Sequence, residues 1–251
     1  MEMQLAPLIA QAGKELGSGR YQEAIDLCSR VINHQQLRAH EIASNPVRTT
    51  EWGNTEVGVD DLVNEGAGVD ALVIRAFAWE KLGKSDLALQ DALTAVSSNP
   101  RPDALWLMGK VFLQEGLLDH MNPEYFRKSV EASGEAIALD SRYVSAYFLR
   151  GCARLRLGEY RGAISDFSIV LDSKEDLGSK AHVLRSEAYL RNRQFAKSIG
   201  DAGWVIKNGP PPDLMQAYVQ LGDGYRLGGK FWLAVDAYDK RQTSAFDRAS
   251  E

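Results

Sequence analysis

Leu157-Gly158-Glu159-Tyr160-Arg161-Gly162-Ala163 is the stretch that decides the fold of this chain. It reads as a glycine turn, followed by an aromatic residue and, three positions later, by a small residue. A similar order of a turn, an aromatic residue and a small residue recurs at 18–24, 82–88, 192–198 and 228–234, although 192–198 has no glycine and 82–88 has Ser85 at the aromatic place. A recurring turn with helical apolar spacing on both sides indicates a repeated helix-turn-helix unit.

Small residues recur at a second fixed place, seven positions before the centre of each turn. They are Ala12, Ala76, Gly151, Ser186 and Gly222. Small side chains at matched places let the two helices of one hairpin pack closely. Pro100 and Pro210 lie where a second helix would end, because proline cannot continue a helix. The pattern therefore predicts an all-α chain built from helix hairpins.

This pattern resembles the tetratricopeptide repeat family, whose 34-residue unit carries small or aromatic residues at these places. The resemblance covers nearly the whole chain and implies a right-handed α-solenoid of about six helix hairpins. The units fall at about 5–38, 69–102, 102–143, 144–177, 179–212 and 215–248. We expect residues 1–251 to form a single solenoid of this kind.

Two insertions interrupt the expected repeats. Residues 38–68 lie between the first and second units, carry six acidic and two basic side chains, and contain Asn-Pro, Gly-Asn and Gly-Ala-Gly turn signals. We expect an acidic loop there, either a tolerated surface insertion or an interaction segment and lid that includes Trp52. Residues 117–125 are expected to delay the second helix of the third unit.

The sequence carries no pattern typical of a catalytic or metal site. Its four histidines lack metal-binding spacing, and Cys28 and Cys152 form no CxxC pair. Residues 224–230 spell most of a phosphate-binding loop, but Phe231 replaces the Ser or Thr of that motif, and the match falls on an inter-helix turn. We expect a protein that is not an enzyme and that uses no cofactor or metal.

Charge and hydropathy limit the partners and the compartment. A net charge of −5 and a pI near 5.5 give no general reason to expect nucleic acid binding. The longest strongly apolar stretch without charges, residues 3–13, is far shorter than the ~18–20 residues that cross a bilayer, so we expect no membrane association. Two cysteines in so long a chain favour a reducing compartment and hence an intracellular protein, cytoplasmic or nuclear.

The resemblance also implies that the first helices of the units line a concave groove. Mapped residue by residue, its apolar floor would contain Val73, Ile74, Trp106, Leu107, Phe148, Leu149, Cys152, Val183 and Leu184. Its rim would contain Lys81, Arg156, Arg191 and Arg226. We expect a non-catalytic scaffold or adaptor that binds a partner's peptide or helix with apolar anchors and acidic flanks. The same apolar row also fits ordinary contacts between adjacent first helices.

Other functions stay open at this point, but one subclass is excluded. The carboxylate clamp that holds Hsp70 and Hsp90 tails needs Lys, Asn and Arg at fixed groove positions. The first three units offer Ile9, Gly13, Ile74, Asp103 and Leu107 there. The alternatives to a groove-binding adaptor are a structural subunit that self-assembles through an uncapped C-terminal repeat near Phe246, and a fragment of a larger repeat protein.

Overall fold

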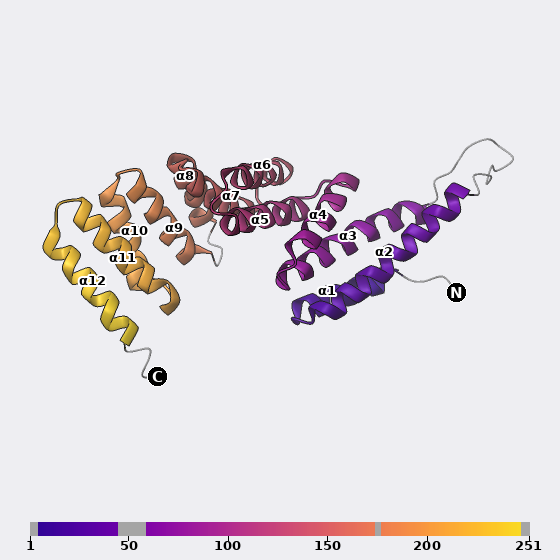
Figure 1. Ribbon diagram of the computed structural model, residues 1–251, viewed down its shortest axis with the longest axis horizontal. Coiled ribbons are helices and arrows are strands. Elements are labelled where there is room, and N and C mark those ends of the chain that lie inside the picture. The colour runs from indigo at the N-terminus through magenta and orange to yellow at the C-terminus, as the bar shows by residue number, and fades with distance from the viewer. Residues whose placement is uncertain (1–4, 45–58, 174–176, 247–251) are drawn as a thin grey trace. The chain divides into compact units, whose positions relative to one another are not determined.

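The computed structural model describes residues 5–44, 59–173 and 177–246, and these form twelve helices (Figure 1). In chain order they are α1 (Leu5–Gly17), α2 (Tyr21–Ser44), α3 (Val59–Lys81), α4 (Ser85–Ser98), α5 (Pro102–Leu118), α6 (Pro123–Leu139), α7 (Val144–Leu157), α8 (Tyr160–Asp172), α9 (Gly178–Arg191), α10 (Phe195–Asn208), α11 (Pro211–Leu227) and α12 (Phe231–Phe246). The helix pairs that pack together are adjacent or next but one in sequence. The expected all-α repeat of helix hairpins is confirmed.

The inter-helix turns have the backbone that the sequence pattern predicts. Gly19, Gly83, Gly158 and Gly229 occupy the same place in four hairpins and all have φ between 71° and 79°. This left-handed conformation is open to glycine at no steric cost, whereas a Cβ makes it unfavourable. In the fifth hairpin, the same place is held by Arg193 with φ of 60°.

The small residues before each turn lie where two helices of a hairpin meet. Ala12, Ala76 and Ser186 have no exposed surface. A Cβ added to Gly151 of α7 would lie 2.8 Å from Cε1 of Phe167 on α8. Close approach of the two helices therefore requires the small residue, as the spacing predicted.

Buried ion pairs join the two helices of three hairpins. Arg75 binds Asp91, Arg150 binds Asp166 and Arg185 binds Asp201, with closest N···O distances of 2.7, 2.8 and 2.8 Å. In each pair the arginine comes from the first helix and the aspartate, at most 8% exposed, from the second. Such charge-assisted bidentate bonds fix how two helices sit against each other.

The described chain divides into two compact units, residues 1–111 and residues 112–251, with the division inside α5. In the first unit, α1, α2 and α3 share a core that includes Leu5, Cys28 and Val31. In the second unit, Leu155, Ala163, Phe167 and Ala188 form a core cluster of α7, α8 and α9. The expectation of a single solenoid over 1–251 stays a prediction.

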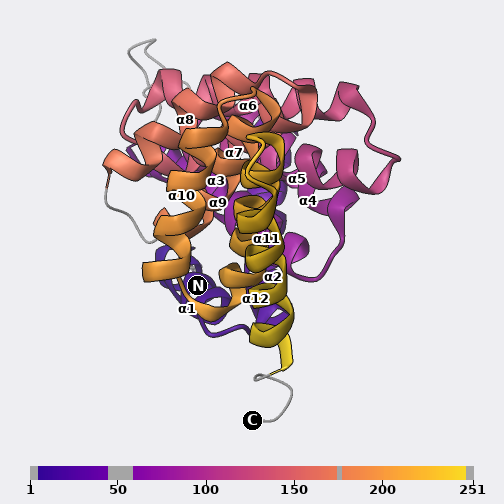
Figure 2. The same cartoon turned by 90° about the vertical axis from the view of Figure 1, so that its left-hand side faces the viewer.

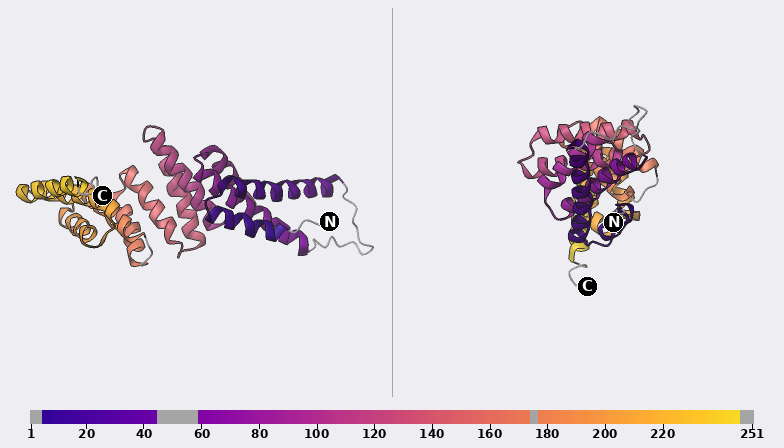
Figure 3. Two further views of the ribbon diagram at one scale, coloured as in Figure 1. Left: turned by 90° about the horizontal axis from the view of Figure 1, so that it is seen from below. Right: turned by 90° about the vertical axis from the view of Figure 1, so that its right-hand side faces the viewer.

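The structure corrects the ends of the first insertion. Residues 38–44 continue α2 and residues 59–68 belong to α3, so these parts of the expected loop are helical, and α2 is a long rod (Figure 3). Gly68 is not a turn residue; Gln35 of α2 packs so close to it that a Cβ would overlap that side chain. Residues 45–58, with Trp52, lie outside the described residues.

The second insertion is also divided between helices. α5 extends through Leu118 and α6 begins at Pro123, which leaves only residues 119–122 between them. Asn122 caps α6, because its side-chain oxygen accepts a hydrogen bond of 3.1 Å from the backbone N–H of Glu124. Proline suits the first turn of a helix, where its missing N–H costs no hydrogen bond. The Asn-Pro pair therefore begins the helix that we expected it to delay.

Candidate functional site

Three predicted floor residues converge in the second unit. Phe148 and Cys152 lie four positions apart on α7 and therefore on one face of it, and Leu184 lies on α9. All three are partly exposed and pack against the core cluster of Leu155, Ala163, Phe167 and Ala188. We call Phe148, Cys152, Leu184 and the neighbouring Arg156 the α7–α9 surface. It is an apolar strip shared by two first helices.

The thiol of Cys152 is not a nucleophile in this setting. Burial raises the pKa of Cys152 to about 12, and the positive charge of Arg156 only partly opposes that rise. The thiolate is the reactive form, so the group is an inert apolar side chain at neutral pH. Burial likewise raises the pKa of Cys28 to about 12. Both cysteines act as packing residues.

The predicted rim cations differ in how far their charge is compensated. Lys81 lies 3.7 Å from Glu80, Arg191 lies 3.7 Å from Glu187, and Arg226 lies 3.1 Å from Asp223. Arg156 is exposed and has no ion pair within 4.0 Å to another described residue, although the Glu187 carboxylate acts on the same Cys152 thiol. The uncompensated positive charge of the α7–α9 surface therefore comes from Arg156.

The first unit holds the remaining predicted residues. Trp106 of α5 is partly exposed, stacks on Phe77 of α3 at a centroid distance of 5.8 Å, and has the Lys110 ammonium 5.3 Å from its ring centre. Ile74 is partly exposed against the core of α1 and α2, and Lys81 is exposed at the end of α3. Trp106 thus lies in a small aromatic and cationic cluster of its own.

Four predicted floor residues are core residues instead. Val73, Leu107, Leu149 and Val183 are buried, with at most 9% of their surface exposed. Val73 packs with Val69, Ala95 and Ala104, and Val183 packs with Val205 and Ala217. A partner cannot contact side chains sealed between neighbouring helices, so these four are removed from the candidate surface.

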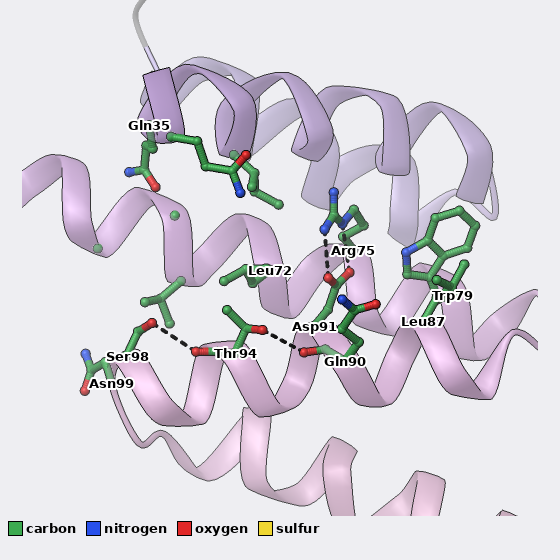
Figure 4. Close-up of a pocket in the computed structure, with 15 residues that line it drawn as sticks. Gln35, Leu72, Arg75, Trp79, Leu87, Gln90, Asp91, Thr94, Ser98 and Asn99 are labelled. Atoms are coloured by element: carbon green, nitrogen blue, oxygen red, sulfur yellow. Dashed lines mark hydrogen bonds and ion pairs between the residues drawn. The ribbon is translucent and has the colours of Figure 1, made fainter. Parts of the chain in front are cut away.

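The sequence analysis missed a cleft in the first unit. It has a volume of about 910 Å³ and lies between α2 and α4 over α3 (Figure 4). Amide side chains border it, namely Gln35, Gln36, Gln90 and Asn99. The Arg75–Asp91 ion pair and Leu72 line its floor. The sequence signal for this cleft was the recurrence of amide side chains on the second helices of the hairpins. We expected no groove residue on those helices.

The cleft is suited to hydrogen bonding. The side-chain nitrogen of Gln35 is buried and has no hydrogen-bond partner among the described residues. On α4, Thr94 and Ser98 donate to backbone carbonyls one turn earlier, at 2.8 and 2.9 Å. Amide side chains that both donate and accept match the needs of a polypeptide backbone.

The described part of the chain was searched for clustered metal-binding side chains and for helices that could span a membrane. It contains no group of three or more His, Cys, Asp and Glu side chains that could hold a metal ion. None of its helices combines the length and the apolar character needed to cross a bilayer.

A stack of helix hairpins with partly exposed apolar strips defines the class of helical-repeat interaction scaffolds. The family model described as "Tetratricopeptide repeat" matches residues 148–211, which cover most of α7 to α10 and the α7–α9 surface. Residues 148–211 therefore match the family that the sequence pattern resembles. Such repeats are generally non-catalytic, which agrees with the expectation that this protein is not an enzyme.

Solved structures show the same fold at low sequence identity. MamA from Desulfovibrio magneticus matches with a TM-score of 0.63 and 16% identity, over 71% of this chain and 96% of that one. A tetratricopeptide repeat protein from Parabacteroides merdae matches with a TM-score of 0.62 and 15% identity, over 96% and 79%. TTC0263 from Thermus thermophilus matches with 0.55 and 16%, over 88% and 98%. No curated protein matches the chain.

Proposed function

We propose that this interaction scaffold holds a partner's peptide or helix on the α7–α9 surface. One observation carries the proposal: partly exposed apolar side chains from two neighbouring first helices meet beside a cation that has no acidic partner in the described residues. Removal of such apolar surface from water favours binding by ~25 cal/mol per Å². Arg156 then favours partners with an acidic residue next to the apolar anchor.

The other predicted site residues that are not buried extend the proposal in each unit. Arg191 and Arg226 add positive charge in the second unit, although Glu187 and Asp223 partly neutralise it. In the first unit, the partly exposed Ile74 and Trp106 and the exposed Lys81 are the remaining candidate contact residues. Acidic flanks on the partner are therefore expected to matter most opposite Arg156.

The test must leave the core intact. Phe148 packs edge-to-face on the buried Phe167 at a centroid distance of 5.9 Å, so a charge at Phe148 would damage the fold together with any binding. Arg156 is exposed and can be reversed without such damage. The intact chain and its Arg156→Glu variant are each used to select from a random 15-residue peptide library.

We expect the intact chain to select peptides with apolar anchors and flanking Asp or Glu, and Arg156→Glu to lose or invert the acidic preference. Arg161→Glu, an equal charge change at an exposed position of α8, is the control and should keep the original preference. Identical selections by Arg156→Glu and the intact chain would contradict the proposal, and so would failure of the intact chain to enrich any apolar peptide.

A further inference from the structure

The cleft of the first unit is a groove that follows the axis of α3. Val69, Leu72 and Trp79 of its floor are three and seven positions apart, and therefore share one face of that helix. The rise of α3 from the first of these residues to the last is about 15 Å. Leu72 lies between Gln35 of α2 and Thr94 of α4 (Figure 4). The volume of about 910 Å³ is within the ~300–1,000 Å³ of typical ligand sites.

The same face of a hairpin in the second unit is covered by the chain's own side chains. In α9 and α10, which lie side by side (Figure 2), His182 stacks on Trp204 with ring centroids 4.1 Å apart. Counted from the arginine of each buried ion pair, His182 and Trp204 correspond to Leu72 and Thr94. A threonine covers far less of the floor than an indole does, so the groove over α3 stays open.

The walls of the cleft carry amide groups that suit an extended backbone. Gln35 and Gln36 line it from α2, and Gln90 lines it from α4. The buried side-chain nitrogen of Gln35 has no hydrogen-bond partner among the described residues. A helix pairs its own backbone groups, whereas an extended segment has N–H and C=O groups free along both edges. Amide walls on two sides therefore match an extended segment better than a helix.

The floor of the cleft selects the side chains of such a segment. The charged side chains among its described lining residues are Arg75 and Asp91, which neutralise each other at an N···O distance of 2.7 Å. A charged ligand side chain would lose its hydration there without gaining a counter-ion. Leu72 adds partly exposed apolar surface. The Lys84 ammonium lies over the ring of Trp79, 4.7 Å from its centre, and so competes with a ligand that would stack there.

We propose that this cleft binds an extended, uncharged segment of a partner polypeptide. The backbone of the segment hydrogen-bonds to the wall amides, and one apolar side chain packs on Leu72. About five residues at ~3.3 Å each cover the floor, and alternate side chains point toward it. The site lies in the first unit and does not depend on the α7–α9 surface. The two sites also differ in selectivity, because the α7–α9 surface favours acidic flanks.

The test fills the cleft in the way that the second unit covers its own hairpin. Thr94→Trp places an indole where α10 carries Trp204, and Thr94 is exposed, so the fold should tolerate the change. The matched control, Ile169→Trp, adds the same indole at the corresponding position of α8, where Ile169 is 40% exposed. A second variant, Gln36→Met with Gln90→Met, removes two exposed wall amides at nearly constant size. Circular dichroism and melting temperature check the fold of each variant.

Each protein selects from a random 15-residue peptide library. We expect the intact chain to enrich a class of uncharged peptides that share an apolar residue. Thr94→Trp should lose this class, whereas Ile169→Trp and Arg156→Glu should keep it. The double methionine variant, and N-methylation of the backbone amides of a selected peptide, should each weaken binding about tenfold. A lactam-bridged, helical form of the same peptide should not bind.

Failure of the intact chain to enrich uncharged peptides, or their retention by Thr94→Trp, would overturn the proposal. Loss of the same class from Ile169→Trp would also overturn it, because the effect would not belong to the cleft. Full binding of the N-methylated or the helical peptide would exclude recognition of an extended backbone. Failure at the α7–α9 surface is distinguishable, since it removes the class of acidic-flanked peptides and leaves the uncharged class in place.

Discussion

At the scale of single residues, the turn between α9 and α10 differs chemically from its counterparts. Four turns place glycine in left-handed backbone, whereas this turn places Arg193 there with φ of 60°. The left-handed conformation costs a non-glycine residue about 1–2 kcal/mol. The α9–α10 turn therefore has the same backbone shape as the glycine turns, but Arg193 adopts a strained conformation in it.

Arg193→Gly is therefore expected to stabilise the chain. Relief of the backbone strain exceeds the extra entropy that glycine gives the unfolded chain, for a net gain of about 0.5–1 kcal/mol. Urea denaturation followed by circular dichroism measures it. Arg193→Ala removes the same side chain but keeps a Cβ, so it should unfold near the wild-type midpoint. A gain of equal size in both variants would show that the side chain, and not the backbone, is responsible.

The carboxylate of Asp201 gives a pH-dependent prediction. Burial raises its pKa, but hydrogen bonds from Arg185 and His182 outweigh burial and leave the pKa below its ordinary value. Because the folded pKa is the lower one, the stabilisation is complete above the unfolded value of about 4 and is lost as pH falls through the folded value.

Asp201→Asn should cost about 3 kcal/mol at neutral pH, because it leaves the half-buried Arg185 without its counter-ion. Urea midpoints measured from pH 7 to pH 2 should fall less steeply for this variant below about pH 4 than for the wild type. Asp236→Asn removes an exposed partner of Lys240 and should leave the urea midpoint near that of the wild type, because solvent screens such a pair. Parallel acid slopes for Asp201→Asn and the wild type would contradict the assignment.

At the scale of elements, the sequence specified where the repeated turns lie and where the helices of a hairpin approach each other, but not the ends of α2, α3, α5 and α6 that border the two insertions. The glycine turns and small residues do this through local backbone geometry and close contact, so a single sequence can show them. The sequence does not predict how each helix is rotated about its own axis. Val73 and Trp106 hold the same repeat position, yet Val73 is buried and Trp106 is partly exposed. Which floor residues face outward depends on the neighbouring helix, and the spacing alone does not state it.

The α7–α8 approach can be tested directly. Gly151→Ala would place a Cβ 2.8 Å from the ring of Phe167, which has no exposed surface in which to move. We expect a loss of about 1–3 kcal/mol from overpacking, measured by urea denaturation. The double variant with Gly151→Ala and Phe167→Leu should lose less unfolding free energy than the sum of the two single variants. The smaller leucine side chain leaves room for the added Cβ. Additive losses would show that the two positions do not touch.

The cleft over α3 shows why the insertion was misjudged. Acidic composition and Gly66-Ala67-Gly68 favoured a loop, since both are common in loops. In the structure Gly68 lets α2 and α3 pack closely, which is a tertiary role. The extended α2 then brings Gln35 and Gln36 to the cleft. Because the cleft lies between α2 and α4, which α3 separates in the sequence, its sequence signal consisted only of dispersed amide residues.

At the scale of the whole molecule, neighbour-to-neighbour packing governs how stability is distributed. Helices of the second unit pack on helices one or two places away in sequence. In such an array each hairpin is stabilised by its own contacts and by those of its neighbours. On α12, Phe231 is 66% exposed and Trp232 is 89% exposed, so this helix lacks one set of these contacts and should open first.

Native-state hydrogen exchange of the intact chain tests that distribution within the second unit. We expect amides of α12 to exchange by local opening at a much lower free energy than amides of α8 and α9, whose faces are covered on both sides by packed neighbours. One common opening free energy for α8, α9 and α12 would mean that the unit unfolds as a single cooperative block, and that the exposed face costs α12 nothing.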